Sequence, residues 1–356
     1  MIVNSQKKID FFKKYFNKKK YVCVDTEFER KKTYFSKLSI ITISDGKKFF
    51  IFDILENPEI IEIIRDLFKS KKLLKIVHGG SQDIEIFLNH KINIEPFFDT
   101  QIASGFLGID KNISYANLVK KFFKKQIDKT HQNMNWLKRP IIKSQINYLK
   151  KDVIYLKKIY DLQIKILKKF KKLKFANEEF TFLVKNIKNN KGINSKFRKK
   201  LGFQICNLKE FFIFLSIRES KGKIENLPKN WILKDEDIIA MIKTRKIEIL
   251  KKNKYFSNLE KGKLTKLLKK IFKIKIKKQN NEIEIKCLEF FRYLVSKKYT
   301  IDANLIASKY DLTDYKNIKS KSKWRKRIYF DVFEKIIRGK KNFILNNFKP
   351  SSQKLH

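Results

Sequence analysis

Apolar and amphipathic runs alternate along the first half of the chain. The short apolar runs, which predict strands, are YVCVDTEF (21–28), KLSIITIS (37–44), KKFFIFDI (47–54) and LLKIV (73–77). Apolar residues at helical spacing predict helices at 57–70, at 82–90 and, as one long helix, at 144–170. The connection Asp45-Gly46 is short enough to favour antiparallel strands on either side. These elements predict a mixed sheet covered by helices, in an α/β domain that ends near residue 172.

The second half of the chain has mainly helical periodicity. A polar stretch rich in Lys and Asn at 186–199 indicates a linker, for which we take residues 173–202. A similar stretch near 277–281 divides the remainder into two modules, residues 203–278 and 279–348. Because neither module has a strongly alternating pattern, both are expected to be all-α.

The charge of the chain points to a class of partner. Among 356 residues, 84 are Lys or Arg and 36 are Asp or Glu, which gives a formal net charge of +48. Such an excess indicates a polyanionic partner such as nucleic acid. The alternative is that a genome-wide drift toward Lys explains a good part of the excess.

Cysteine usage and hydropathy indicate the compartment. Cys23, Cys206 and Cys287 are widely spaced, which argues against a zinc site and a disulfide framework and favours a reducing environment. No segment approaches the ~20 apolar residues that span a bilayer, and the N-terminus lacks the apolar core of a signal peptide. We therefore expect a cytoplasmic protein that does not associate with membranes.

Acidic residues occur at specific places in the predicted elements. The first strand carries Asp25 and Glu27, whose side chains point to the same side and repel each other unless a cation lies between them. Asp83 follows the turn Gly79-Gly80 at the start of a helix, where a carboxylate also suits the helix dipole. Tyr148 and Asp152 share one face of the long helix. Hard carboxylate oxygens select Mg²⁺ or Mn²⁺, so the set predicts a divalent-cation site.

These motifs resemble those of ribonuclease D, in the DEDDy branch of the 3′→5′ exonucleases. The matching segments are Asp25-Thr26-Glu27-Phe28, His78-Gly79-Gly80-Ser81-Gln82-Asp83, Asp99-Thr100-Gln101, Trp136-Leu137-Lys138-Arg139-Pro140 and Tyr148-Leu149-Lys150-Lys151-Asp152. Residues 214–242 resemble the first HRDC domain of that family, and residues 301–312 with Trp324-Arg325 resemble its more divergent second one. Ser36, Gln82 and Asn135 stand where the family usually has Pro, Glu and Asp, and none of these departures removes an expected metal ligand.

The resemblance implies both an architecture and an activity. It implies an RNase H-like (DnaQ-like) α/β exonuclease domain with a mixed sheet over residues 1–172, followed by two all-α HRDC-type domains at 203–278 and 279–348. The implied activity is that of a metal-dependent 3′→5′ exoribonuclease, which trims tRNA precursors and other small structured RNAs and releases nucleoside 5′-monophosphates by two-metal-ion hydrolysis. Two Mg²⁺ or Mn²⁺ ions per site, an RNA partner and a monomeric state are implied as well.

The resemblance also assigns roles to residues. Asp25 would bridge both ions, Glu27 and Asp152 would complete the site of one ion, and Asp83 would hold the other. Tyr148 would orient the attacking water, because an unperturbed phenol has a pKa near ~10 and is a poor base at neutral pH.

Other residues have weaker assignments. Phe28, His78 and Arg139 are candidate substrate contacts, each with a structural role as the alternative. Asp99 would support the ligands or act as a helix cap. In the helical modules, Trp231 and Trp324 are expected to anchor cores rather than to stack on bases.

Other functional interpretations remain open at the level of the sequence. A 3′→5′ DNA exonuclease would use the same acids. A non-catalytic RNA-binding protein with a decayed site is a second alternative, which the intact acidic set argues against. A purely structural basic scaffold leaves that set unexplained.

Overall fold

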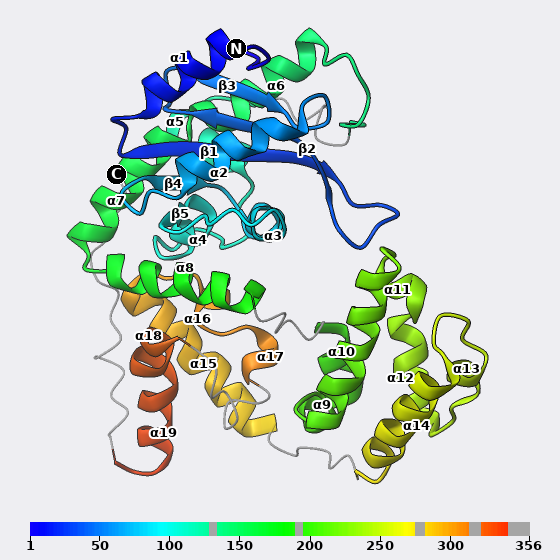
Figure 1. The fold of residues 1–356 in the computed structure, drawn as a ribbon. Coiled ribbons are helices and arrows are strands. Elements are labelled where there is room, and N and C mark those ends of the chain that lie inside the picture. The colour runs from blue at the N-terminus through cyan, green and yellow to red at the C-terminus, as the bar shows by residue number, and fades with distance from the viewer. Residues whose placement is uncertain (128–133, 189–194, 275–281, 313–321, 341–356) are drawn as a thin grey trace.

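The computed structural model describes residues 1–127, 134–188, 195–274, 282–312 and 322–340 (Figure 1). Its N-terminal domain is built on a five-stranded sheet of order β3-β2-β1-β4-β5. The strands are β1 (Tyr21–Glu29), β2 (Lys37–Ser44), β3 (Phe49–Asp53), β4 (Leu74–Val77) and β5 (Phe97–Asp99). β1 pairs antiparallel with β2 and parallel with β4, so the predicted mixed sheet is confirmed and β1 is its central strand.

Helices cover this sheet. They are α1 (Gln6–Phe16), α2 (Ile61–Phe68), α3 (Ser81–Asn89), α4 (Thr100–Gly105), α5 (Tyr115–Phe123), α6 (Lys143–Ile154) and α7 (Leu156–Lys169), with a 3₁₀ turn η1 (Pro58–Ile60) before α2. α1 buries Phe12 and Phe16, which pack against Phe50 of β3. Burial of these apolar faces against the sheet provides the main driving force for the domain.

The prediction of a single long helix at 144–170 is wrong, because the chain forms two helices, α6 and α7, that meet at Tyr155. The backbone N–H of Tyr155 donates to the hydroxyl of Tyr115 at 3.1 Å, and this hydroxyl donates to the carbonyl of Lys151 at 3.1 Å. A side chain that inserts into the backbone ladder of a helix is a known cause of a kink. The apolar stripe continues through the kink, so periodicity alone could not reveal it.

Residues 173–188, within the predicted linker, form helix α8 (Leu173–Lys188). Ala176, Phe180 and Val184 are buried at helical spacing, and Phe180 contacts Phe97 and Phe98 of β5. The helix therefore packs onto the N-terminal domain. The exact domain boundaries stay predictions.

The middle module has its own hydrophobic core. Its helices are α9 (Ser195–Cys206), α10 (Lys209–Ile224), α11 (Lys229–Ile232), α12 (Asp235–Thr244), α13 (Glu248–Lys251) and α14 (Asn258–Phe272). A buried ion pair between Arg218 and Asp235 at 2.6 Å joins α10 to α12. Trp231 is 53% exposed, so its predicted role as a core anchor is wrong. Its helix α11 has only four residues, too few to show a buried face by periodicity.

The C-terminal module shares a continuous core with the N-terminal domain. Its elements are α15 (Glu282–Tyr299), α16 (Ala303–Ile306), α17 (Lys309–Leu312), α18 (Lys323–Arg325), the π-helical turn η3 (Lys326–Phe330) and α19 (Asp331–Ile337). Trp324 is fully buried and contacts Phe106 of the N-terminal domain and Phe175 of α8, which confirms its predicted anchoring role. Within the described part of the chain, none of the helices combines the length and apolar character needed to cross a bilayer.

Candidate active site

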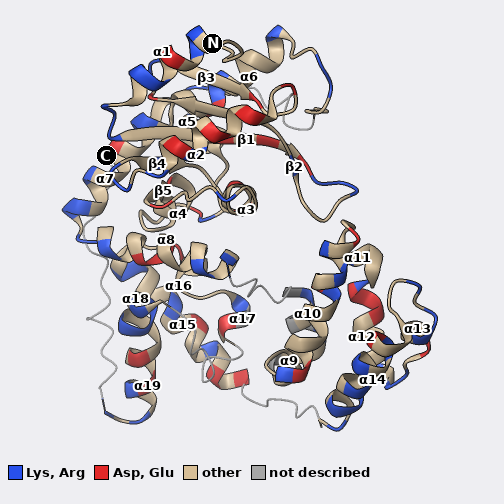
Figure 2. Ribbon diagram, viewed as in Figure 1, with Lys and Arg blue, Asp and Glu red and all other residues tan. Residues whose placement is uncertain are grey.

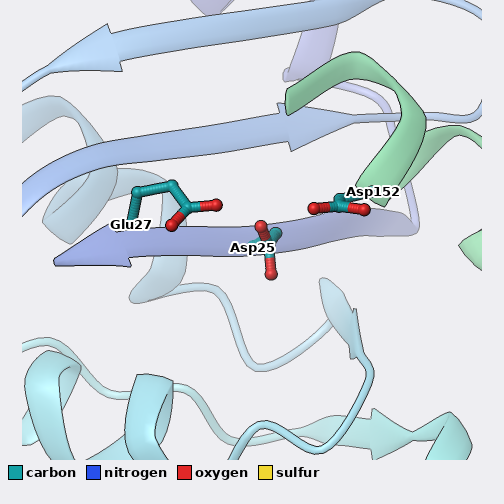
Figure 3. Close-up of side chains that lie close together, drawn as sticks. All are labelled: Asp25, Glu27 and Asp152. Atoms are coloured by element: carbon teal, nitrogen blue, oxygen red, sulfur yellow. The ribbon is translucent and has the colours of Figure 1, made fainter. Parts of the chain in front are cut away.

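Three carboxylates from distant parts of the chain meet beside the central strand. Asp25 and Glu27 lie on β1 and Asp152 lies on α6, and one oxygen atom of each is within 4.8 Å of the other two. Their side chains face one another (Figure 3). Pairing of β1 with β2 holds Asp25 opposite Thr42 and Glu27 opposite Ile40, so two of the three carboxylates are fixed by a backbone ladder.

A cavity of about 600 Å³ surrounds this cluster. Asp83 and Tyr148 line the same cavity, so the structure brings all five predicted catalytic residues together. The first turn of α3 supplies Asp83, and the hydroxyl of Thr26 donates a hydrogen bond to its carboxylate. Asp83 thus stands beside the cluster and is bound to the residue between the two acids of β1.

Asp99 fixes the turn that leads to Asp83. Its carboxylate accepts hydrogen bonds from the backbone N–H groups of Gly79 at 3.0 Å and Gly80 at 2.9 Å, and it also caps α4. Gly79 has φ of +62°, and a Cβ on Gly80 would lie 2.7 Å from Val77, so this tight turn requires glycine at both positions. The contacts of Asp99 are those of a structural residue.

Tyr148 lies one helical turn before Asp152 on α6. Its hydroxyl hydrogen-bonds to the carboxylate of Asp152, and its ring packs against Trp136 with centroids 5.7 Å apart. Burial and the nearby carboxylates raise the pKa of Tyr148 further above its ordinary value. The phenol therefore stays protonated at neutral pH and can act as a hydrogen-bond donor.

The electrostatics of the cavity are unfavourable for the acids by themselves. Burial, followed by repulsion from the neighbouring carboxylates, raises the pKa of Asp25 and Glu27. Burial also raises the pKa of Asp83 and of Asp152 to about 6 each, although hydrogen bonds from Thr26 and Tyr148 respectively counteract this rise. Like charges held together in a poorly solvated space favour uptake of protons or of a cation.

The donor set fits a divalent cation. Asp25, Glu27 and Asp152 each offer a carboxylate oxygen, which is the ligand type that Mg²⁺ and Mn²⁺ prefer. Bound positive charge would offset the repulsion that the raised pKa values reflect.

The predicted substrate contacts have different surroundings. Phe28 and His78 both line the cavity. The Nδ1 atom of His78 lies 2.9 Å from the Thr100 hydroxyl and its Nε2 atom lies 3.0 Å from the carbonyl of Ile113, so both ring nitrogens have protein partners. These contacts favour the structural alternative for His78 and leave Phe28 as the aromatic candidate beside the acids.

The guanidinium of Arg139 forms a two-pronged ion pair with the carboxylate of Asp53. The guanidinium donates to both oxygens of Asp53, at 2.6 Å each, and to the hydroxyl of Ser39 at 2.9 Å. The side chains of Arg139 and Asp53 are 16% and 11% exposed. This geometry favours the structural alternative for Arg139.

Sequence reasoning assigned no role to several residues at the site. Thr26 and Trp136 stand inside the recognised motifs, and their contacts with Asp83 and Tyr148 show what they do. Arg30 and Lys31 line the cavity just after β1, and their position directly downstream of the acids was the available signal. Tyr115 is reached only through the fold, because it lies 40 residues before Tyr155 in the chain.

Comparison with known proteins gives this geometry a context. Residues 1–168 match a family model described as 3′-5′ exonuclease. The chain is 28% identical over 365 residues to ribonuclease D of Bartonella henselae, an alignment that covers 94% of this chain and 89% of that protein. It is 29% identical to ribonuclease D of Shewanella sp., where the alignment covers 62% of this chain and 58% of that protein.

Solved structures agree with the overall fold. Escherichia coli RNase D, an exoribonuclease involved in structured RNA processing, superposes with a TM-score of 0.74 and 19% identity, covering 96% of this chain and 99% of that chain. The catalytic core of RRP6 from Trypanosoma brucei superposes with a TM-score of 0.51 and 18% identity, covering 76% of this chain and 79% of that chain. The exonuclease match, the similarity to ribonuclease D over most of both chains and the converging acids lead to one conclusion: this chain is a 3′–5′ exoribonuclease that is similar to ribonuclease D.

Proposed function

We propose that this protein removes nucleotides one at a time from the 3′ ends of tRNA precursors and other small structured RNAs, releasing nucleoside 5′-monophosphates with the help of two Mg²⁺ or Mn²⁺ ions. The observation that carries the proposal is the meeting of Asp25, Glu27 and Asp152 within 4.8 Å, in a cavity that also holds Asp83 and Tyr148.

Each of these residues has a task in the proposed reaction. Asp25, Glu27 and Asp152 would hold one divalent ion, and Asp25 with Asp83 would hold the other. When bound, such a pair stabilises the attacking and leaving oxygens of an in-line displacement. Tyr148 keeps its proton and orients the attacking water by hydrogen bonding.

The surroundings of the cavity support a polynucleotide substrate. Arg30 and Lys31 line the catalytic cavity and also a second cavity of about 730 Å³. The far side of this second cavity belongs to the middle module, where Lys223 and Lys229 line it. Arg30 is paired with Glu85 at 2.8 Å and Lys229 with Glu219 at 3.4 Å, so we assign the phosphate contacts to Lys31 and Lys223. A strand whose 3′ end lies at the acids would pass between the two domains, near these two lysines.

Basic residues elsewhere support the same partner. Lys and Arg are spread over the whole molecule and are frequent on α7 and α14 (Figure 2). Contacts between such side chains and phosphates are independent of sequence and weaken as salt rises. We expect RNA binding to weaken steeply with ionic strength.

End-labelled RNA and DNA of matched sequence, incubated with the full chain and either Mg²⁺ or a chelator, test the proposal. The expected result is a ladder that shortens from the 3′ end, on RNA only and only with metal. Asp152→Asn should slow the reaction by at least ~10²-fold while RNA binding persists. Asp161→Asn is the matched control, because Asp161 is a largely exposed acid on α7 that pairs with Lys157.

Three outcomes would contradict parts of the proposal. Equal degradation of DNA and RNA would contradict the proposal that RNA is the specific substrate, because a site that reads the 2′-hydroxyl must distinguish the two polymers. RNA binding without any shortening would indicate a non-catalytic protein. Full activity of Asp152→Asn would refute the assignment of the site.

A further inference from the structure

The junction between α6 and α7 is held by a side chain from another helix. In a regular α-helix the N–H of Tyr155 would donate to the carbonyl of Lys151. Here the hydroxyl of Tyr115 lies between them, accepting from Tyr155 N–H and donating to the Lys151 carbonyl, each at 3.1 Å. The inserted hydroxyl satisfies both backbone groups at the junction, so the kink leaves neither of them without a partner.

This insertion is adjacent to the catalytic turn. Lys151, whose carbonyl accepts from Tyr115, directly precedes Asp152 in the chain, and Tyr148 lies one turn earlier. Asp152 lies in the last turn of α6 and Tyr148 in the turn before it, so the direction of these two turns determines where both side chains point. A contact that fixes this backbone therefore acts on the geometry of the active site.

The ring of Tyr115 is itself anchored to the sheet. It packs on a cluster formed by Cys23 of β1, Ile76 of β4 and Val153 and Leu156 on the two sides of the kink. Cys23 lies two residues before Asp25 on the same strand. The ring also meets His78 edge-on, with centroids 5.6 Å apart. Tyr115 thus links β1, which carries Asp25 and Glu27, to α6, which carries Asp152.

We propose that Tyr115 is a positioning residue for the reaction: its hydroxyl, inserted between Lys151 and Tyr155, sets the orientation in which α6 presents Tyr148 and Asp152 to Asp25 and Glu27. This inference rests on the proposed function, and it adds a residue that is not among those that line the catalytic cavity. The alternative is that Tyr115 matters only as an apolar ring in the core.

Tyr115→Phe in the full chain separates the positioning role of the hydroxyl from the packing role of the ring, because it removes only the hydroxyl. Without it, the Lys151 carbonyl loses its Tyr115 donor and the Tyr155 N–H keeps only its contact with the Val153 carbonyl, or the two backbone groups bond to each other and straighten the helix. We expect kcat to fall by about 10- to 100-fold, with KM for RNA unchanged. The affinity for Mn²⁺, measured directly by electron paramagnetic resonance without RNA, should fall by about tenfold.

Tyr160→Phe is the matched control, because Tyr160 packs on the same cluster through a ring that contacts Phe98. It should keep wild-type kcat and Mn²⁺ affinity. In addition, the amide of Tyr155 should exchange with deuterium faster in Tyr115→Phe than in the wild type without metal, since the Tyr115 acceptor is gone and only the contact with the Val153 carbonyl remains. 4-Aminophenylalanine at position 115 restores a polar group that can donate to Lys151, and it should recover part of kcat.

Wild-type kcat and Mn²⁺ affinity in Tyr115→Phe would overturn the inference. So would a loss that 4-aminophenylalanine does not relieve, because a failure of packing alone is insensitive to the polar group. If Tyr115→Phe folds poorly, the comparison of 4-aminophenylalanine with Phe at position 115 still distinguishes positioning from packing. Absence of nuclease activity in the wild type would contradict the proposed function instead, while Mn²⁺ affinity and amide exchange would still test the role of Tyr115.

Discussion

Thr26 donates a hydrogen bond from its hydroxyl to the carboxylate of Asp83, and so joins the central strand to the first turn of α3. Thr26 stands between Asp25 and Glu27 in the chain. A single tripeptide therefore contributes two carboxylates to the cluster and also holds a third acid beside it. This explains how Asp83, far away in sequence, is kept at the cavity although it lies outside the group of three.

Replacing Thr26 with Val tests this relationship. The change keeps the β-branched shape and removes the hydrogen bond, which otherwise lowers the pKa of Asp83 against the effect of burial. We expect kcat to fall by about tenfold and the Mg²⁺ concentration for half-maximal activity to rise. Thr26→Ser keeps the hydroxyl and should stay close to the wild type. Equal loss in both variants would point to packing rather than to the hydrogen bond.

Local patterns predicted the parts of this molecule that depend on local sequence. The strands at 21–28 and 37–44 and the position of Asp25 and Glu27 on one of them follow from alternation and β-branched residues over a few positions. The spacing of Tyr148 and Asp152 likewise follows from one helical turn. No local pattern encodes the convergence of these groups in space. The resemblance to a known family was what predicted it.

The parts that sequence could not predict depend on distant partners. The break between α6 and α7 at Tyr155 lies where the hydroxyl of Tyr115 is inserted, 40 residues away in the chain, and Arg139 pairs with Asp53, 86 residues away. The polar segment at 186–199 led to the prediction of a linker over residues 173–202. Its first part, up to residue 188, is instead the helix α8, whose apolar stripe packs on β5. In each case a tertiary contact, rather than local propensity, determines the outcome.

The pairing of Arg139 with Asp53 makes a separate prediction. Arg139→Ala leaves the carboxylate of Asp53 in a poorly solvated place without its partner, which should lower the free energy of unfolding by about 3 kcal/mol. KM for RNA should stay unchanged for the folded protein. Denaturant unfolding and steady-state kinetics check the two expectations. A raised KM with unchanged stability would restore Arg139 as a substrate contact.

The buried acids predict an unusual dependence of stability on pH. Burial raises the pKa of Asp83 and Asp152 to about 6 in the folded protein, above the value of 3.8 for an unperturbed Asp. A raised folded-state pKa favours folding while the group is protonated, so this contribution is present at low pH and is lost as pH rises through the folded pKa. Without metal, the contribution of these two carboxyls to the free energy of unfolding should therefore decrease from about pH 4 to about pH 8.

Asp152→Asn isolates this effect. The variant should unfold at a higher temperature than the wild type at about pH 8 in chelator, and the difference should shrink toward about pH 4. Mg²⁺ should raise the wild-type melting temperature more than that of the variant, because it binds the ionised carboxylates of the folded state. Thermal unfolding across pH, with and without Mg²⁺, gives the comparison. Parallel curves for the two proteins would contradict the prediction.

The contact between Tyr34 and Glu219 connects the N-terminal domain to the middle module. Tyr34 lies in the loop between β1 and β2, which reaches toward α10 and α11 (Figure 1). Its hydroxyl donates to the carboxylate of Glu219 on α10, and its ring lies 3.2 Å from where a Cβ on Gly222 would stand. The same loop contributes the backbone N–H of Phe35, which donates to Asn226 at 3.3 Å. This contact borders the 730 Å³ cavity proposed to hold the RNA strand.

Tyr34→Ala should loosen this connection without affecting the acids. Loss of the hydrogen bond and of the buried ring removes ~1–3 kcal/mol of interaction, and part of that loss should appear as an increase in KM of about tenfold for a long RNA. kcat on a dinucleotide, which reaches the acids but not the second cavity, should stay at the wild-type value. Phe35→Ala removes a ring that packs edge-on against Tyr34, with centroids 4.9 Å apart, but it keeps the hydroxyl of Tyr34 and the backbone N–H of residue 35. It should therefore raise KM for the long RNA less than Tyr34→Ala does. If both substrates were affected equally, the second cavity would have no part in holding the strand, and the loop would act on the catalytic site itself.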